Sequence, residues 1–364
     1  MSPAPPELVS GAVFAYPRRS AQRKWLDRWS VVLAALSLAL LPFAAPHASA
    51  ATHKDLLDNR LYVVNYLSDS VSVIDTNTNA VVGSAIPVGG NPIAVATDTV
   101  RARAYVANYS SHDVSVIDTK TNTVVRPAVS VGNNPTAVAV DTVRGRAYVV
   151  NYGSGSVSVI DTNTDTVVGS AIPVGNEPSG VAVDSLRGRA YVANSDQGTV
   201  SVIDTRTNTV VGSPISVGSN PYGVAVDTVR GRAYVANFLS DSVSVIDTRT
   251  NTVVGSPIPV GNAPRGVAVD ILRGRAYVAN SGSGSVSVVD TNTDTVVGLP
   301  VSVGNNPAAV AVDMLRGRAY VANSDSDSVS VVDTNTNAVV GSPISVGSMP
   351  TGVALKNSPR SAVH

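Results

Sequence analysis

Side chains that could perform catalysis are scarce in this sequence of 364 residues. It contains no cysteine, and His112 is the only histidine between His53 and His364. Without cysteine the chain has no disulfide, no thiolate zinc ligand and no cysteine nucleophile. A Ser–His–Asp site around His112 would have to take its serine and aspartate from flexible loops. We therefore expect no catalytic residue, no metal site and no cofactor.

Side chains suited to binding are better represented. Glu177, Tyr222 and Arg265 occupy similar places in three successive segments of the chain. A carboxylate, a phenol and a guanidinium around one opening could hold a small polar ligand or a peptide side chain. The alternative is that they are solvated loop residues. The same choice applies to the other candidate binding residues, which are His112, Phe238, Asp196 and Gln197.

Two acidic segments could in principle bind a hard cation. Residues 324–328 read Ser-Asp-Ser-Asp-Ser, and Ser68 precedes Asp69. Their oxygen atoms are of the type that calcium prefers, but the acidic twelfth ligand of an EF-hand loop is missing. We expect polar turns at both places.

All these residues lie in a sequence that repeats every 43 residues. The interval separates seven tyrosines (Tyr62, Tyr105, Tyr148, Tyr191, Tyr234, Tyr277, Tyr320) and seven aspartates (Asp75, Asp118, Asp161, Asp204, Asp247, Asp290, Asp333). Each unit holds four short runs rich in strand formers, for example residues 223–227, 233–237, 242–247 and 252–258. The repeat predicts an all-β chain of seven four-stranded units, with strands A to D in order.

The composition of the strands predicts their order from the centre of the ring outward. Strand D carries Pro214, Pro257, Pro300 and Pro343 in four of the units. Since proline cannot donate to a strand ladder, strand D should lie at an outer edge. Strand A consists of glycine, alanine and valine, which suit strands that converge on a crowded axis. Together these features predict a seven-bladed β-propeller.

The two ends of the repeated region predict how the ring closes. The first unit starts with strand B near residue 60, and the last residues of the region, 349–355, form a strand A without a B, C or D. We expect residues 352–355 to pair with residues 61–65 and close the ring. An open β-solenoid would leave two exposed sheet ends that need caps.

Variation between the units gathers in two of the four kinds of link. In a propeller the D–A and B–C links lie on one face, and the A–B and C–D links on the other. The residues after the D–A proline all differ or nearly so: Ile93, Thr136, Ser179, Tyr222, Arg265, Ala308 and Thr351. Binding faces of rigid scaffolds vary in this way, and so do loops that drift freely.

The opposite face is much more regular. Arginine pairs recur there, from Arg101 and Arg103 to Arg316 and Arg318, and we expect them to form salt bridges with neighbouring aspartates. The repeated asparagine that ends strand B, such as Asn65, is expected to cap the following B–C loop.

The repeated Tyr-Val-Ala-Asn and Ser-Val-Ser-Val-Ile-Asp-Thr motifs resemble the YVTN family of β-propeller repeats over residues 57–356. That family is known from bacterial and archaeal exported and surface-layer-like proteins, so the resemblance implies a similar fold and setting. Similar rings serve many functions. The sequence departs from the family in its Asp-x-x-Arg-Gly-Arg turn and in Lys356, which replaces the aspartate of the six preceding units.

The first fifty residues are typical of a secretory signal peptide. Basic residues at 18–28 precede an apolar run at 31–45, and Ala48-Ser49-Ala50 is a small-x-small cleavage pattern. We expect a signal peptide at 1–50, a propeller at 51–356 and a short tail at 357–364. An uncleaved anchor is the alternative, although 15 residues are short for a membrane span. A periplasmic, cell-surface or extracellular location follows, without a membrane span in the mature chain.

The function predicted from these features is that of an exported, non-enzymatic scaffold that binds a protein or a glycan. The alternative is a lactonase-like hydrolase or an accessory protein of periplasmic redox metabolism. Equal numbers of basic and acidic residues, 26 of each, argue against a nucleic-acid partner. We expect a monomer.

Overall fold

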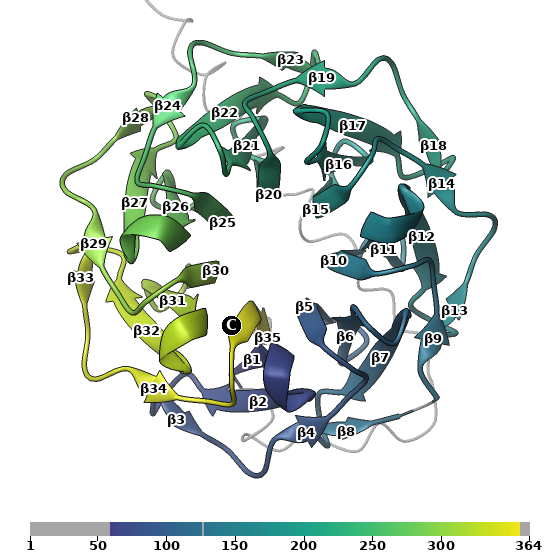
Figure 1. Ribbon diagram of the computed structural model, residues 1–364, viewed down its shortest axis with the longest axis horizontal. Helices are drawn as coiled ribbons and strands as arrows, with labels where there is room; N and C mark the ends of the chain where they lie inside the picture. Colours follow the sequence, from purple (N-terminus) through teal and green to yellow (C-terminus); the bar gives the residue numbers. More distant parts are fainter. Residues whose placement is uncertain (1–58, 126, 357–364) are drawn as a thin grey trace, which may run out of the picture. The chain divides into compact units, whose positions relative to one another are not determined.

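The computed structural model describes residues 59–125 and 127–356, which form seven antiparallel sheets around a central axis (Figure 1). The predicted seven-bladed β-propeller is confirmed. The predicted signal peptide and C-terminal tail lie outside the described residues. Among the residues described, no helix is long and apolar enough to cross a membrane.

The innermost strand of each blade, strand A, begins at a proline. These strands are β5 (Pro92–Asp98), β10 (Pro135–Asp141), β15 (Pro178–Asp184), β20 (Pro221–Asp227), β25 (Pro264–Asp270), β30 (Pro307–Asp313) and β35 (Pro350–Lys356). Strand B follows as β1 (Arg60–Asn65), β6 (Arg103–Asn108), β11 (Arg146–Asn151), β16 (Arg189–Asn194), β21 (Arg232–Asn237), β26 (Arg275–Asn280) and β31 (Arg318–Asn323). Small residues in strand A allow the seven strands to approach the axis.

Strand C is the third of each blade. It comprises β2 (Ser70–Asp75), β7 (Asp113–Asp118), β12 (Ser156–Asp161), β17 (Thr199–Asp204), β22 (Ser242–Asp247), β27 (Ser285–Asp290) and β32 (Ser328–Asp333). Four of the B–C loops contain one turn of 3₁₀ helix: η2 (Tyr66–Ser68), η3 (Tyr152–Ser154), η4 (Ser281–Ser283) and η5 (Ser324–Ser326).

Strand D lies at the outer edge, as predicted, but it is broken into two short ladders. The first is β3 (Ala80–Val81), β8 (Thr123–Val124), β13 (Thr166–Val167), β18 (Thr209–Val210), β23 (Thr252–Val253), β28 (Thr295–Val296) and β33 (Ala338–Val339). The second is β4 (Ile86–Pro87), β9 (Val129–Ser130), β14 (Ile172–Pro173), β19 (Ile215–Ser216), β24 (Ile258–Pro259), β29 (Val301–Ser302) and β34 (Ile344–Ser345). The break has a local cause in six of the blades, where a glycine between the two ladders adopts a positive φ, as Gly255 does at +66°. Proline is not required, because Ala85 and Ala171 occupy the position of Pro257 in blades with the same break.

The ring closes between the two ends of the described chain, as predicted. Strand β35 pairs antiparallel with β1, so that Leu61 stands opposite Leu355 and Val63 opposite Val353. The first blade therefore consists of β35, β1, β2, β3 and β4. Lys356 ends this strand, and its Nζ donates to the carbonyl oxygen of Thr119 in the next blade at 2.9 Å.

Apolar side chains fill the space between neighbouring blades. Each repeated tyrosine of strand B is fully buried, and its hydroxyl reaches the C–D turn of the following blade. Tyr234, for example, donates to Asp294 Oδ1 at 2.8 Å. Burial raises the pKa of these phenols, to about 12 for Tyr148, Tyr191, Tyr277 and Tyr320.

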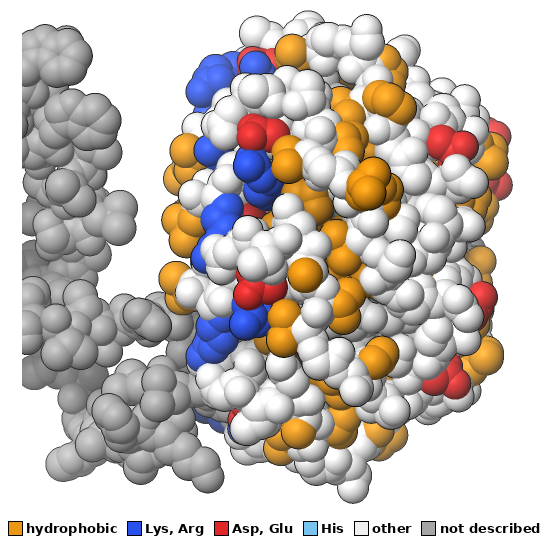
Figure 2. Space-filling view, turned by 90° about the vertical axis from the view of Figure 1, so that its left-hand side faces the viewer, with side chains coloured by type: hydrophobic (Ala, Val, Ile, Leu, Met, Phe, Trp, Pro, Cys, Tyr) orange, Lys and Arg blue, Asp and Glu red, His pale blue; other side chains and the backbone are white. Residues whose placement is uncertain are grey.

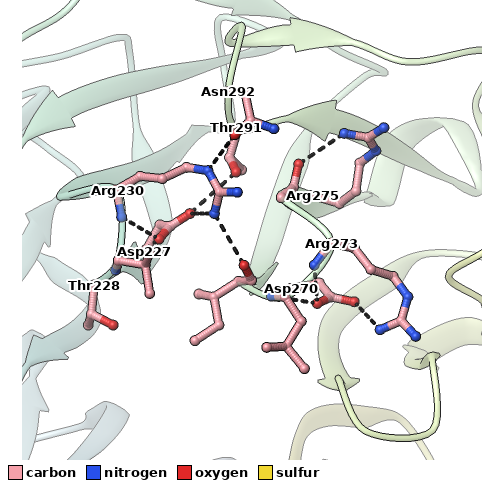
Figure 3. A network of polar contacts seen from close by, with 12 residues as sticks. Asp227, Thr228, Arg230, Asp270, Arg273, Arg275, Thr291 and Asn292 are labelled. Carbon is pink, nitrogen blue, oxygen red and sulfur yellow. Dashed lines mark hydrogen bonds and ion pairs between the residues drawn. The ribbon is translucent and has the colours of Figure 1, made fainter. Parts of the chain in front are cut away.

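A polar network links the blades on the A–B/C–D face (Figure 3). The fully buried carboxylate of Asp227 accepts the Arg230 amide at 2.9 Å and Arg230 Nη1 at 3.0 Å. The same Nη1 donates to the Ile271 carbonyl of the next blade, and Nε donates to Asn292 Oδ1. The predicted salt bridges are therefore present within the blades, and the same arginines donate hydrogen bonds across the blade boundaries.

The repeated asparagine does not cap the B–C loop, contrary to the prediction. The 3₁₀ helix after Asn65 has no side-chain cap, and Asn65 Nδ2 instead donates to Ser70 and Ser72 of strand C. In the third blade the oxygen of Asn151 accepts the Gly132 amide of the D–A link at 3.1 Å. Strand C presents hydroxyl groups beside this asparagine, so its side chain forms hydrogen bonds with strand C instead of with the B–C loop.

Candidate functional site

The candidate site is the mouth of the central channel on the D–A/B–C face. The cavity there has a volume of about 170 Å³. Its outer ring contains the seven residues that follow the D–A prolines, namely Ile93, Thr136, Ser179, Tyr222, Arg265, Ala308 and Thr351. Arg265 is the single charged residue in the lining of this cavity.

Three small hydroxyl residues of this ring fasten one blade to the next. Ser179 donates to the Pro221 carbonyl at 2.9 Å, and Thr136 donates to that of Pro178 at 3.2 Å. Thr351 makes the same contact across the closing blade. Their hydroxyl protons are already used, so these residues shape the mouth rather than offer free donors.

Tyr222 and Arg265 replace these small residues in two adjacent blades, and their side chains meet. Arg265 Nη2 donates to Tyr222 Oη at 3.0 Å, and the guanidinium carbon lies 4.9 Å from the centre of the tyrosine ring. The ring of Phe238, from a B–C loop, lies 6.4 Å from that of Tyr222. Stacking on an aromatic face holds the guanidinium in place while its edge can still donate.

The close approach of the neighbouring A strands fixes the backbone positions from which the Tyr222 and Arg265 side chains extend. A Cβ atom on Gly180 would lie 2.1 Å from the Tyr222 carbonyl oxygen, and one on Gly223 would lie 2.4 Å from that of Arg265. Both distances are far below contact, so only glycine permits this spacing of β15, β20 and β25.

Glu177 lies beside a residue that sequence reasoning did not select. Burial and a hydrogen bond with Glu177 raise the pKa of Tyr152 to about 12. The signal was available, because aromatic residues open four of the seven B–C loops: Tyr66, Tyr109, Tyr152 and Phe238.

His112, Asp196 and Gln197 lie farther out, where they connect loops. His112 Nδ1 accepts the Asn134 amide at 3.0 Å, the role that Asp69 has in the first blade. Gln197 Oε1 accepts the Asn176 amide at 3.3 Å, and Asp196 accepts from the Asn176 side chain at 3.4 Å. The structure thus brings together Tyr222, Arg265 and Phe238, with Glu177 beside Tyr152, and gives the other three candidates contacts between loops.

The two faces differ in charge. Over the described residues, one basic residue on the D–A/B–C face, Arg265, stands against seven acidic residues, a formal charge of −6: Asp69, Asp113, Glu177, Asp196, Asp241, Asp325 and Asp327. The remaining described charges, 17 basic and 15 acidic, lie on the A–B/C–D face and sum to +2. The arginines form a band on that face, at the left of Figure 2.

The same described region holds no cluster of three or more histidine, aspartate or glutamate side chains that could bind a metal ion. The acidic segments at 68–69 and 324–328 take part in loop contacts instead. Asp69 Oδ1 accepts the Asn91 amide, and Asp327 Oδ1 accepts that of Met349, both at 2.7 Å.

Comparison with known proteins identifies the fold. No family model matches the chain, and no curated protein matches it. A protein of unknown function from Desulfotomaculum acetoxidans superposes with a TM-score of 0.70 at 16% identity, over 82% of this chain and 98% of its own.

Two further solved structures have stated activities. Hydrazine synthase from Kuenenia stuttgartiensis has a TM-score of 0.67 at 21% identity, over 80% of this chain and 99% of its own. A proposed 6-phosphogluconolactonase from Bacteroides uniformis has a TM-score of 0.69 at 14% identity, over 82% of this chain and 99% of its own. At these identities the likeness shows a common seven-bladed fold, and the closer resemblance to YVTN repeats stays a prediction.

Proposed function

We propose that this protein is an exported, non-enzymatic scaffold that binds a protein or glycan partner through its D–A/B–C face. The observation that carries the proposal is the cluster of Arg265, Tyr222 and Phe238 at the channel mouth. Arginine and aromatic residues that are held rigidly at the centre of a face are the types that dominate binding energy in interfaces. The leader sequence supports export to the periplasm or the cell surface.

The charge pattern narrows the chemistry of the partner. The rim is acidic and the centre carries one guanidinium, so a partner with a basic or hydroxyl-rich periphery and a central carboxylate would complement it. A sugar acid or an acidic peptide side chain presents such a carboxylate. Because the cavity measures about 170 Å³, it admits one such group rather than a whole oligosaccharide.

The proposal is tested by probing the immobilised full chain with a glycan array and a synthetic peptide library. Replacing Arg265 by Gln removes the central charge and should weaken the best probe by at least about tenfold, as expected for an interface hot spot. Lys120→Gln, at an exposed turn on the opposite face, is the matched control and should bind normally. Equal binding by both variants would contradict the assignment of the site.

An enzymatic assay tests the alternative function. The purified full chain is screened for lactone hydrolysis, and no turnover is expected. Turnover by the parent chain that is lost in Glu177→Gln or His112→Asn would show that the protein is a hydrolase and would contradict the non-enzymatic function.

A further inference from the structure

Six exposed aliphatic side chains form a ring on the face opposite the channel mouth. They occupy one position of the A–B turn in six successive blades and are 52–73% exposed: Val100, Val143, Leu186, Val229, Leu272 and Leu315. We call this set the aliphatic crown. Single exposed aliphatic residues are ordinary, but one at the same place in every described A–B turn is a surface feature.

The crown is built to be flat. Each A–B turn is held by its own aspartate, as in the fifth blade, where Asp227 Oδ1 accepts the amides of Val229 and Arg230. Each strand A also packs against the next around the ring. Because the blades repeat the same geometry about one axis, the six tips lie at the same height. Figure 2 shows hydrophobic side chains at the outer limit of this face, beyond the arginine band.

Several charged residues surround the crown. Lys120, Arg206 and Arg249 are exposed in C–D turns on this face, farther from the axis than the A–B turns. The face as a whole carries a formal charge of +2, against −6 on the other. An anionic surface would therefore attract this side of the ring and repel the opposite side.

The chain enters and leaves the ring on this same face. Strand β1 begins there at Arg60, and β35 ends there at Lys356. The apolar run at 31–45 precedes Arg60 by 15 residues, a distance of at most about 50 Å of extended chain. In the uncleaved chain, the apolar run is therefore joined through residues 46–59 to a strand that begins on the crown's face.

We propose that the aliphatic crown docks on the surface of a lipid bilayer that carries anionic headgroups. The crown repeats one apolar contact around the axis in six of the seven blades, so it favours no direction among these blades, and a bilayer has no preferred direction in its plane either. The six side chains would enter the boundary between headgroups and acyl chains, with the basic turns at headgroup level. The D–A/B–C face with Arg265 then points away from the membrane and stays open to its partner.

Two other occupants would cover the same crown, and the test separates them. The chain's own N-terminal segment could lie on it, or a second copy of the protein could. Both would bury the crown without vesicles, and burial by a second copy would depend on protein concentration.

The experiment places a fluorescent reporter on each face of the full chain. The described residues contain no tryptophan, so Leu272→Trp reports on the crown and Leu239→Trp, 69% exposed in a B–C loop, is the matched control. The parent chain, measured under each condition, supplies the contribution of Trp25 and Trp29. Vesicles of phosphatidylcholine with and without phosphatidylglycerol carry bromine atoms at the top of the acyl chains, at the depth of about 5–10 Å that interfacial groups reach.

The expected result is a blue shift and bromine quenching of the L272W chain on vesicles with phosphatidylglycerol, with neither in the L239W chain. An unshifted L272W chain on these vesicles would overturn the proposal. A blue shift without vesicles would also overturn it, and would assign the crown to the N-terminal segment or, if it grows with concentration, to a second copy.

A second pair of variants measures the contribution of the crown without a reporter. Replacing Leu186, Leu272 and Leu315 together by Asn should lower the vesicle-bound fraction in flotation at least about threefold, as expected when apolar contact with the interface is lost. Leu67→Asn with Leu239→Asn alters equally exposed leucines on the other face and should leave the fraction unchanged. Equal loss in both variants, or in neither, would contradict docking through the crown.

Discussion

Replacing Asp227 by Asn tests whether the network between blades is a main source of stability. The carboxylate is fully buried and accepts four hydrogen bonds, from the amides of Val229 and Arg230, from Arg230 Nη1 and from the Thr291 hydroxyl. Asparagine keeps one acceptor oxygen but turns an amide group toward a guanidinium or a backbone amide. Arg230 then loses its counter-charge in a setting where its side chain is only 25% exposed.

The size of the effect follows from the loss of one partner of a buried ion pair. Such a loss costs about 3–5 kcal/mol, and the partial exposure of Arg230 favours the lower end, about 3 kcal/mol. With an unfolding entropy of about 2.1 cal/mol/K per residue and roughly 300 residues in the ring, the melting temperature should fall by about 5 °C.

Urea unfolding followed by circular dichroism measures this change in the free energy of unfolding. Asp325→Asn, at an exposed position in a B–C loop, is the control and should change stability by less than about 0.5 kcal/mol. If an unpaired guanidinium is the cause, Arg230→Met in the Asp227→Asn background should restore at least about 1 kcal/mol. A single variant as stable as the control, or no recovery in the double variant, would refute the reasoning.

Three further predictions concern the turns, the tyrosines and the closing strand. Ala102 adopts a φ of +53° where Gly145 stands in the next blade, so Ala102→Gly should stabilise the protein in urea by about 0.5–1 kcal/mol and Gly145→Ala should destabilise it by at least as much. The buried phenols, among them Tyr148, have pKa values raised above 10, so the stability that they provide is present below pH 10 and is lost as the pH rises toward 12; phenolate absorbance and loss of circular dichroism should therefore appear together in that interval, and phenolate formation in an intact fold would contradict this. Deleting residues 349–364 removes β35 and should sharply lower the melting temperature, which an unchanged thermal scan would disprove.

Repetition explains why the sequence predicts so much of the fold. A 43-residue interval kept without insertion fixes the number of blades, and the surplus strand A at residues 349–355 fixes the closure. The break in strand D was not predicted because a glycine such as Gly255 is compatible with a continuous edge strand. The break depends on its positive φ, a backbone conformation that strand propensity does not describe.

The site was less predictable because its geometry rests on side-chain conformations. Position in the repeat places Tyr222 and Arg265 at the channel mouth, but it does not show that the guanidinium stacks on the phenol ring. His112 shows the opposite difficulty. An isolated histidine in a loop suggests a ligand-binding residue, yet its Nδ1 accepts the Asn134 amide and so has the same role as Asp69 in the first blade.

The residues of the two faces are constrained for different reasons, and those reasons do not account for the residues of the crown. On the A–B/C–D face the repeated aspartates and arginines hold the blades together, so their repetition needs no further cause. The side chain at the tip of the A–B turn, such as that of Leu272 or Val229, does not hold the blades together, because it is exposed and the turn is fixed by neighbouring residues. A serine or lysine side chain would fit the turn equally well and would be better solvated in water. The aliphatic residue at all six described tips therefore supports the proposed apolar environment of this face, whereas Arg265 stacked on Tyr222 supports the proposed partner site on the other.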